Sequence, residues 1–219
     1  PVTAEDCVAS LQRWAARDVM GQKLLTFVAD MTPTSAREFR VRLKEPTGLL
    51  LQSMAKPSSS PAFMMPKRVA MTEPTTQITD YTGSGPFMFR KDLWQPGAKV
   101  VYERFRDYRP RAEPPSGLAG GKVAKVDKVV WLPISDHQQA INALLANEVD
   151  YIEAPPHDLY PLVKSDPATR LIDWNPLGSQ YNFRFNTLHK PFDDPRVRQA
   201  LLYAFDQEQF LRAVVGDPH

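Results

Sequence analysis

The 219-residue sequence contains a single cysteine, Cys7, so an internal disulfide bond is excluded. Histidine is also scarce, and no two histidines or cysteines have the short spacing typical of a zinc site. The four histidines are far apart in the sequence: His137, His157, His189 and His219. We therefore expect neither a bound metal ion nor another cofactor.

An excess of one charge is missing as well. Lys and Arg number 27 against 25 Asp and Glu, which gives a formal net charge of +2, and this balance does not indicate a nucleic acid as partner. Uninterrupted apolar stretches are far shorter than the about 18 residues that cross a bilayer. No signal peptide is visible, and the sequence starts at Pro1 in what already resembles a helix start. We expect a piece excised from a longer protein.

Catalytic motifs are not found. Ser135, Asp136 and His137 are the residue types of a hydrolytic triad, but they are adjacent in sequence, whereas triad members converge from different elements. No Gly-x-Ser-x-Gly motif occurs. The segment GSGPF at 83–87 is a poor phosphate loop, because Pro86 has no N–H and a strand-like stretch follows. The sequence therefore does not predict an enzyme.

Proline, in contrast, is abundant: 21 prolines separate short periodic segments. Thr3 followed by Asp6 is a capping-box pattern and predicts a helix over 3–17. Alternating apolar and basic residues predict a half-buried strand over 37–46, and a short apolar helix follows it at 47–55. The next stretch is rich in Pro, Ser and Thr, and it predicts a long connection with a domain boundary near Asp80.

Predicted strands alternate with predicted helices after this boundary. A helix is expected over 135–150, with Ser135 as its N-cap and Gln138 completing a capping box. Asp194 followed by Pro195 predicts the start of a later helix. Strands are expected at 87–91, 99–105, 125–134, 149–152, 170–174 and 180–186, and a second helix at 157–166. The alternation favours an α/β fold with a mixed or parallel sheet and flanking helices.

Five motifs, in this order, resemble those of the extracytoplasmic solute-binding proteins (family 5) that serve ABC importers of dipeptides, oligopeptides and nickel. The departures from the family pattern are few and lie in turns or at the surface: Ser84 for a threonine, Phe105 and Arg106 for Asn-Pro, and Asn147 for a glycine. The motifs are VTAED (2–6), GSGPF (83–87), WQPGAKVVYERFRDYRP (94–110), ALLANEVDYI (143–152) and FNTLHKPFDDPRVRQALLYAFDQEQF (185–210).

This resemblance implies part of a periplasmic-binding-protein-like fold (type II, peptide-binding class). Residues 1–79 would end the extra subdomain of lobe one, 80–186 would form the central part of that lobe, and 187–219 would be the truncated start of lobe two. The implied function is to capture a peptide or related small solute between two lobes and to deliver it to an ABC permease in the membrane. The implied location is the periplasm, or a lipid anchor outside the cytoplasmic membrane.

The resemblance also suggests ligand-binding residues at strand ends that face the cleft. Glu153 is expected to meet the amino group of a peptide, although an exposed loop acid fits the sequence equally well. Tyr181 and Phe183 lie on the strand expected to cross toward lobe two, and core packing is an equal alternative for them. The candidate residues are Ile152, Glu153, Ala154, Pro155, Tyr181 and Phe183. The main anchors of peptide-binding relatives are expected in the second lobe.

Other functions remain open at this point. A ligand sensor or a chaperone-like binding protein could use the same fold, and a hydrolase is less favoured. We expect Gly85→Val to be destabilising, because a glycine before a proline often needs special backbone angles. The apolar residues near the end of the chain could fold back on lobe one, become disordered or pack against another copy of the chain, and we favour the third, self-association. These residues are Val197, Leu201, Phe205, Phe210, Leu211 and Val214.

Overall fold

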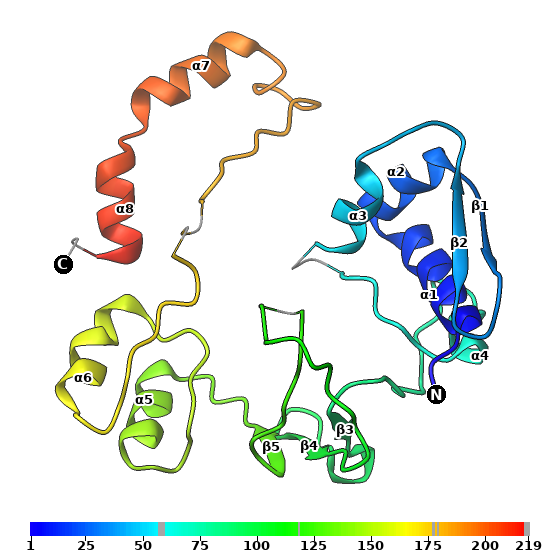
Figure 1. Ribbon diagram of the computed structural model, residues 1–219. Helices are drawn as coiled ribbons and strands as arrows, with labels where there is room; N and C mark the ends of the chain where they lie inside the picture. Colours follow the sequence, from blue (N-terminus) through cyan, green and yellow to red (C-terminus); the bar gives the residue numbers. More distant parts are fainter. Residues whose placement is uncertain (57–59, 118, 177, 179, 217–219) are drawn as a thin grey trace. The chain divides into compact units, whose positions relative to one another are not determined.

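The computed structural model describes residues 1–56, 60–117, 119–176, 178 and 180–216, and the chain divides into two units, Pro1–Pro133 and Ile134–His219 (Figure 1). Helices and short strands occur together along the chain, as the predicted α/β class requires. The first unit contains a helical part followed by a small sheet. The second unit contains helices joined by extended chain.

The first unit opens with two consecutive helices, α1 (Ala4–Arg17) and α2 (Val19–Phe27). The predicted capping box is confirmed: the Asp6 N–H donates to the Thr3 hydroxyl at 3.3 Å, and the Thr3 N–H donates to the Asp6 carboxylate at 2.9 Å. α2 was not predicted. A Cβ on Gly21 would lie 2.6 Å from the Cα of Ala15, so the close approach of α1 and α2 requires glycine there.

A β-hairpin packs against these helices. β1 (Val28–Pro33) pairs antiparallel with β2 (Phe39–Leu43). β2 confirms the strand predicted over 37–46, and α3 (Leu49–Met54) confirms the short helix predicted after it. Val41 and Leu43 of β2 pack against the buried core, while Arg40 and Arg42 are exposed. The core residues are Leu11, Trp14, Ala15, Leu24 and Val28.

The predicted connection after α3 contains a short helix, α4 (Lys67–Ala70), and it is tied to α1 by hydrogen bonds. The buried Ser10 hydroxyl donates to the Met65 carbonyl at 3.1 Å and accepts from the Met65 N–H at 2.9 Å. The Arg13 guanidinium donates to the carbonyl of Glu73 at 3.1 Å and of Thr76 at 2.8 Å. The connection is therefore bound to the first helix along much of its length.

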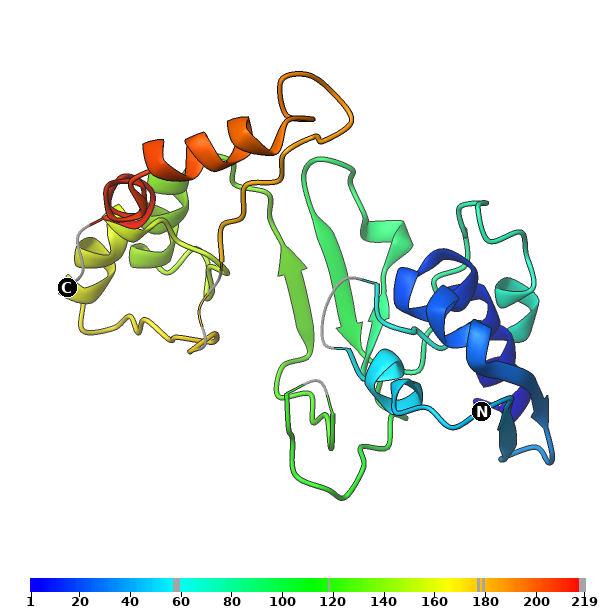
Figure 2. The same cartoon turned by 90° about the horizontal axis from the view of Figure 1, so that it is seen from above.

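The second sheet has the order β3-β4-β5, with β3 (Phe87–Phe89), β4 (Val100–Arg104) and β5 (Lys128–Trp131), and all three strands were predicted (Figure 2). Between β3 and β4 lie a short 3-10 helix, η1 (Lys91–Leu93), and a Pro-Gly turn, where Gly97 has a φ of 77°. Both described sheets are antiparallel, whereas a mixed or parallel sheet was expected.

The second unit begins with α5 (His137–Leu145). Its N-cap is Asp136, whose carboxylate accepts from the Gln139 N–H at 2.7 Å, so the predicted cap at Ser135 with Gln138 was wrong by one residue. The helix ends in a Schellman arrangement: Glu148 N–H donates to the Ala143 carbonyl at 2.8 Å and Asn147 N–H to Leu144 at 3.0 Å. Asn147 has a φ of 58°, a left-handed conformation that glycine and asparagine tolerate best.

The second predicted helix is confirmed as a 3-10 turn, η2 (His157–Leu159), followed directly by α6 (Tyr160–Ser165). The strands predicted at 149–152, 170–174 and 180–186 were wrong, because none of their described residues joins a β-ladder. A strand needs a hydrogen-bonded neighbour, and no described segment of this chain pairs with them. The expected parallel strand pairs are also not seen among the described residues, because these segments have no partner there.

Two further helices follow the extended segment. α7 (Pro195–Ala204) starts at the predicted cap: the carboxylate of Asp194 accepts from the Arg196 N–H at 2.8 Å. The N-cap of α8 (Gln207–Val215) is Asp206, whose carboxylate accepts from the Gln209 N–H at 3.0 Å. Neither helix buries a side chain completely, so their apolar stripes remain accessible in this chain.

Candidate functional site

The first group of candidate residues, Ile152 to Pro155, lies on irregular chain between α5 and η2. Ile152 and Pro155 are half-buried, whereas Glu153 and Ala154 are exposed. Within the described part of the chain, no hydrogen bond or ion pair involves the Glu153 side chain. Its carboxylate is therefore free to meet a positively charged group.

The second group contains Tyr181 and Phe183 on the extended segment before α7. Tyr181 is 60% exposed and Phe183 is 66% exposed, so the described chain does not enclose them. Their rings contact two phenylalanines that frame the start of α8. The centroids of Phe183 and Phe205 are 4.9 Å apart, and those of Tyr181 and Phe210 are 6.0 Å apart. These four rings, Tyr181, Phe183, Phe205 and Phe210, are called the aromatic cluster below.

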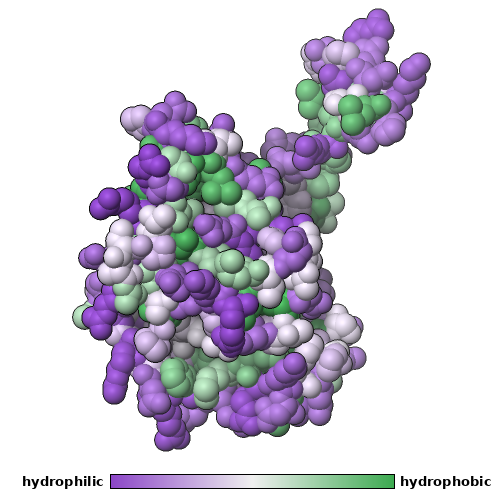
Figure 3. Space-filling model, turned by 90° about the vertical axis from the view of Figure 1, so that its right-hand side faces the viewer, coloured by the Kyte–Doolittle hydropathy of each residue, from purple (hydrophilic) through white to green (hydrophobic). Residues whose placement is uncertain are grey.

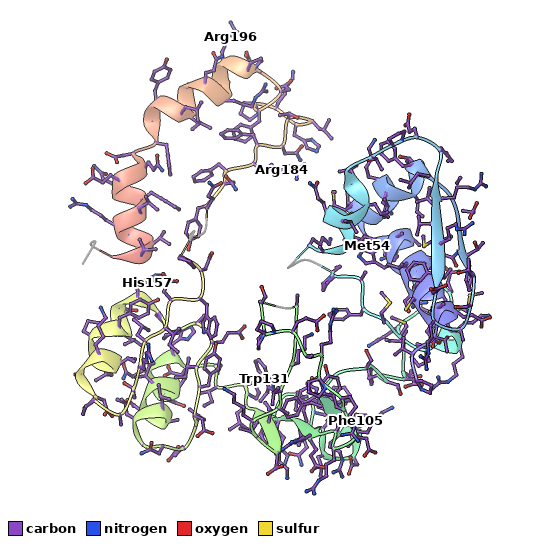
Figure 4. The ribbon with its side chains drawn as sticks, viewed as in Figure 1. Met54, Phe105, Trp131, His157, Arg184 and Arg196 are labelled. Atoms are coloured by element: carbon purple, nitrogen blue, oxygen red, sulfur yellow. The ribbon has the colours of Figure 1, made fainter. Side chains whose placement is uncertain are left out.

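The sequence predicted two of the four residues in the aromatic cluster as ligand-binding residues. Tyr181 and Phe183 were predicted as ligand-binding residues, but Phe205 and Phe210 were predicted only to take part in self-association. Phe205 and Phe210 also contact each other at 5.2 Å. On the same extended segment lies Arg184, and Arg196 lies farther along on α7 (Figure 4). Four partly exposed rings offer flat apolar surface of the kind that stacks on a ligand. In the part of the chain that the structure describes, no hydrogen bond, ion pair or ring contact joins this cluster to residues 152–155.

An open depression of about 1440 Å³ lies between the η2–α6 region and α8. Its lining begins at Pro156, directly after the candidate residue Pro155. His157 and Tyr160 also line it, and their rings contact each other at a tilt of 47° with centroids 4.9 Å apart. Charged side chains also line it, including Asp158, Lys164 and Glu208. The depression thus combines apolar walls with both signs of charge.

A second depression of about 560 Å³ in the first unit is lined by the GSGPF turn and by the neighbouring β3. Aromatic rings lie close together beside it: Phe89 contacts Tyr81 at 5.4 Å and Tyr102 at 5.7 Å between centroids. A Cβ on Gly85 would meet nothing within 4 Å, and its φ is not in the left-handed region. The reason for expecting Gly85→Val to be destabilising was therefore wrong.

The surface carries hydrophobic residues among hydrophilic ones on the face in Figure 3. Among the described residues, no helix is long and apolar enough to cross a membrane, and no group of three or more His, Cys, Asp or Glu could hold a metal ion. Cys7 is half-buried in α1, and its pKa is raised by burial and by the nearby charge of Asp6. A thiol of this kind is a poor nucleophile at neutral pH.

The chain is similar to known proteins over nearly all of its length. The family model of the bacterial extracellular solute-binding proteins, family 5 Middle, matches residues 1–218. A probable peptide ABC transporter periplasmic-binding protein from Sinorhizobium fredii is 44% identical over 220 residues, which cover 100% of this chain and 41% of that protein. The chain thus spans about two fifths of the length of this relative.

Solved structures show the same fold. The oligopeptide-binding protein AppA from Bacillus subtilis, in complex with a nonapeptide, matches 99% of this chain and 41% of its own, with a TM-score of 0.70 and 22% identity. A dipeptide-binding protein from Pseudoalteromonas sp. SM9913, in complex with Met-Leu, matches 96% of this chain and 42% of its own, with a TM-score of 0.70 and 19% identity.

The fold of the chain is part of the periplasmic-binding-protein fold seen in these solved structures. The chain belongs to the bacterial extracellular solute-binding proteins of family 5. This membership confirms the family resemblance and the fold class seen in the sequence, and the family is described as one of solute-binding proteins.

Proposed function

We propose that the protein containing this chain is the solute-binding component of an ABC importer, which captures a peptide or a related small solute between two lobes and delivers it to a membrane permease. The observation that carries this proposal is the 44% identity, over all of the chain, to a probable peptide ABC transporter periplasmic-binding protein. The same relative supports a periplasmic location. A lipid anchor outside the cytoplasmic membrane is the alternative.

In this proposal residues 1–79 end the extra subdomain of the first lobe, 80–186 form the central part of that lobe, and 187–219 begin the second lobe. The ligand would meet Ile152 to Pro155 on one side. Tyr181 and Phe183 would offer their exposed rings on another. The free carboxylate of Glu153 suits a peptide amino group, because a charge-assisted hydrogen bond between them is strong.

The first experiment identifies the solute. The full-length protein is purified without denaturation, and the small molecules that it carries are released and analysed by mass spectrometry. A peptide or a related small solute supports the proposal. Candidates are then tested by calorimetry against the full-length protein. A protein that binds only unfolded polypeptides, or that hydrolyses its ligand, would contradict it.

Two variants with matched controls test the candidate residues in the full-length protein. Glu153→Gln should weaken peptide binding at least about tenfold, since it removes one charge-assisted bond. The control is Glu148→Gln, at another exposed acid whose side chain has no hydrogen-bond or ion-pair partner within the described ranges. Tyr181→Ala should weaken binding, whereas Tyr203→Ala, at a tyrosine that is 93% exposed on α7, should not. Equal affinities within either pair would remove that residue from the site.

A further inference from the structure

The chain between β4 and β5 is a long loop that extends away from the ends of these strands (Figure 2). Backbone hydrogen bonds close this loop at two places. At its base, the Arg104 N–H donates to the Asp127 carbonyl at 2.8 Å. Farther out, the Gly121 N–H donates to the Glu113 carbonyl, also at 2.8 Å. The loop therefore has two arms, 105–112 and 121–126, which are joined at both ends.

Glycine is required at the outer junction. A Cβ on Gly121 would lie 2.6 Å from the Arg111 carbonyl oxygen and 2.7 Å from that of Glu113. A Cβ on Gly120, whose φ is 77°, would lie 2.1 Å from the Pro114 carbonyl oxygen. Side chains cannot be accommodated at such distances, so the two glycines allow the arms to meet. The arms are held in this arrangement by the fold of the loop itself.

The loop is strongly basic in a chain that is nearly neutral. Residues 104–128 contain seven Lys and Arg and three Asp and Glu, a formal net charge of +4, while the whole chain carries +2. Several of these cations are paired in the structure: Arg111 contacts Glu113 at 2.6 Å, and Lys128 contacts Glu103 at 3.6 Å. The positive charge is thus concentrated in one segment.

Four cations of the loop have no partner in the part of the chain that the structure describes. Arg106 and Arg109 lie on the first arm, and Lys122 and Lys125 lie on the second. All four are exposed, and the first arm also carries the exposed acid Asp107. Because the arms are joined at both ends, the loop holds these like charges near one another. Such an arrangement attracts a surface that carries many negative charges.

Apolar side chains alternate with the lysines on the second arm. Val123 is 64% exposed and Val126 is 52% exposed, and each directly follows a lysine in the sequence KVAKVDK. Phe105 at the base of the first arm is 39% exposed. Basic residues mixed with exposed apolar ones are typical of segments that lie in the headgroup region of an anionic membrane.

We propose that the two arms of this loop, 105–112 and 121–126, form a peripheral binding surface for anionic phospholipid headgroups, with Arg106, Arg109, Lys122 and Lys125 contacting the phosphates and Val123 and Val126 entering the headgroup layer. The spread of charge over two arms, without an enclosing pocket, suits many distributed anions better than one small ion. This surface is independent of solute binding, and it would keep the protein near the membrane.

The test uses the full-length protein without solute and vesicles of phosphatidylcholine, with or without phosphatidylglycerol. Flotation should show binding only to vesicles with phosphatidylglycerol, and binding should fall as salt is raised. Replacing all four cations by glutamine should weaken it at least about 100-fold, since each cation near an anionic surface contributes several-fold. Val123→Ser with Val126→Ser should weaken it less.

The control variant removes the same number of positive charges elsewhere, with glutamine in place of four exposed cations. These are Arg17, Arg37, Arg40 and Lys164, whose side chains have no hydrogen-bond or ion-pair partner among the described residues. It should bind the vesicles like the unmodified protein. Equal urea midpoints of both variants would show that folding is intact. The proposal is overturned by absence of vesicle binding, by equal binding without phosphatidylglycerol, by equal losses in the two variants, or by complete displacement with inorganic phosphate at constant ionic strength.

Discussion

At the scale of single residues, Asp18 connects two parts of the first unit through its side chain. Its side chain is nearly buried at the junction of α1 and α2, where it accepts from the Gly21 N–H at 3.0 Å and forms an ion pair with Lys56. The Lys56 side chain is also largely buried, with 19% exposed. The pair thus joins the start of α2 to the chain after α3.

Lys56→Met should lower the free energy of unfolding by about 3 kcal/mol, because it leaves a nearly buried carboxylate without its counter-ion. The matched control is Lys67→Met, which removes an exposed pair with Glu5 whose atoms are 3.0 Å apart. That loss should be below about 1 kcal/mol. Urea denaturation of both variants measures the difference, and equal losses would show that burial of the first pair is unimportant.

The same ion pair predicts a dependence on pH. The pKa of Asp18 is lowered because Lys56 donates to its carboxylate, and the Gly21 N–H adds to this effect against the opposing effect of burial. A lowered folded-state pKa contributes stability that is present above the unfolded value of about 3.9 and is lost as pH falls through the folded value. Asp18→Asn should therefore lose less stability than the unmodified chain when pH falls below about 4. Parallel acid titrations of the two proteins would contradict this.

Asn147 allows another test. Its left-handed backbone closes the end of α5, so Asn147→Ala should cost about 1 kcal/mol, while Asn147→Gly should be neutral or stabilising. Thermal unfolding of the two variants decides this. The family resemblance had a glycine at this position, and the backbone explains why only these two residue types fit well. Equal stability of the alanine and glycine variants would be inconsistent with the observed φ.

At the scale of elements, two glycines with different surroundings can be compared. Gly121→Ala should open the junction of the β4–β5 loop and cost about 1–3 kcal/mol, because the new methyl group overlaps two carbonyl oxygens. Gly85→Ala should be close to neutral, since the space around it is open. Limited proteolysis should cleave the loop faster in the first variant. Unchanged cleavage in both would show that the loop tolerates the added methyl group.

Sequence reasoning succeeded for elements whose signals are local. The caps at Thr3 and Asp194 depend on side chains within three residues, and the hairpin of β3 and β4 depends on a nearby Pro-Gly turn. α2 was missed, although Asp18 before an apolar segment is a cap signal. Strand pairing depends on distant partners, so alternation at 180–186 could not show whether a ladder forms. The contacts of Phe183 with Phe205 and Phe210 could not be predicted either, because these residues are distant in the sequence.

At the scale of the whole chain, the accessible stripes of α7 and α8 favour self-association. Leu201 and Phe205 are each 40% exposed, and large apolar patches rarely stay in water on a monomer. The 219-residue chain should therefore form dimers or larger species in light scattering, and Leu201→Ser with Phe205→Ser should reduce them. Leu188→Ser, at an isolated residue that is 88% exposed, should not. A strictly monomeric unmodified chain would contradict this prediction.

The whole chain should bind peptides weakly or not at all by itself. It spans 41% of the length of its relative, and in the proposed function the second lobe supplies most of one wall of the cleft. Calorimetry with dipeptides and oligopeptides should detect no micromolar binding to the 219-residue chain, in contrast to the full-length protein. Micromolar binding by the chain alone would place the complete site within these residues.

The half-buried Cys7 makes site-specific labelling practical. Its raised pKa keeps the thiol protonated and slow to react at neutral pH. Ser116 is exposed at the tip of the β4–β5 loop, beyond the junction at Gly121. A maleimide dye would therefore react selectively with the thiol of a Ser116→Cys variant of this chain. Its fluorescence would report the surroundings of the loop tip in real time without replacement of the native cysteine.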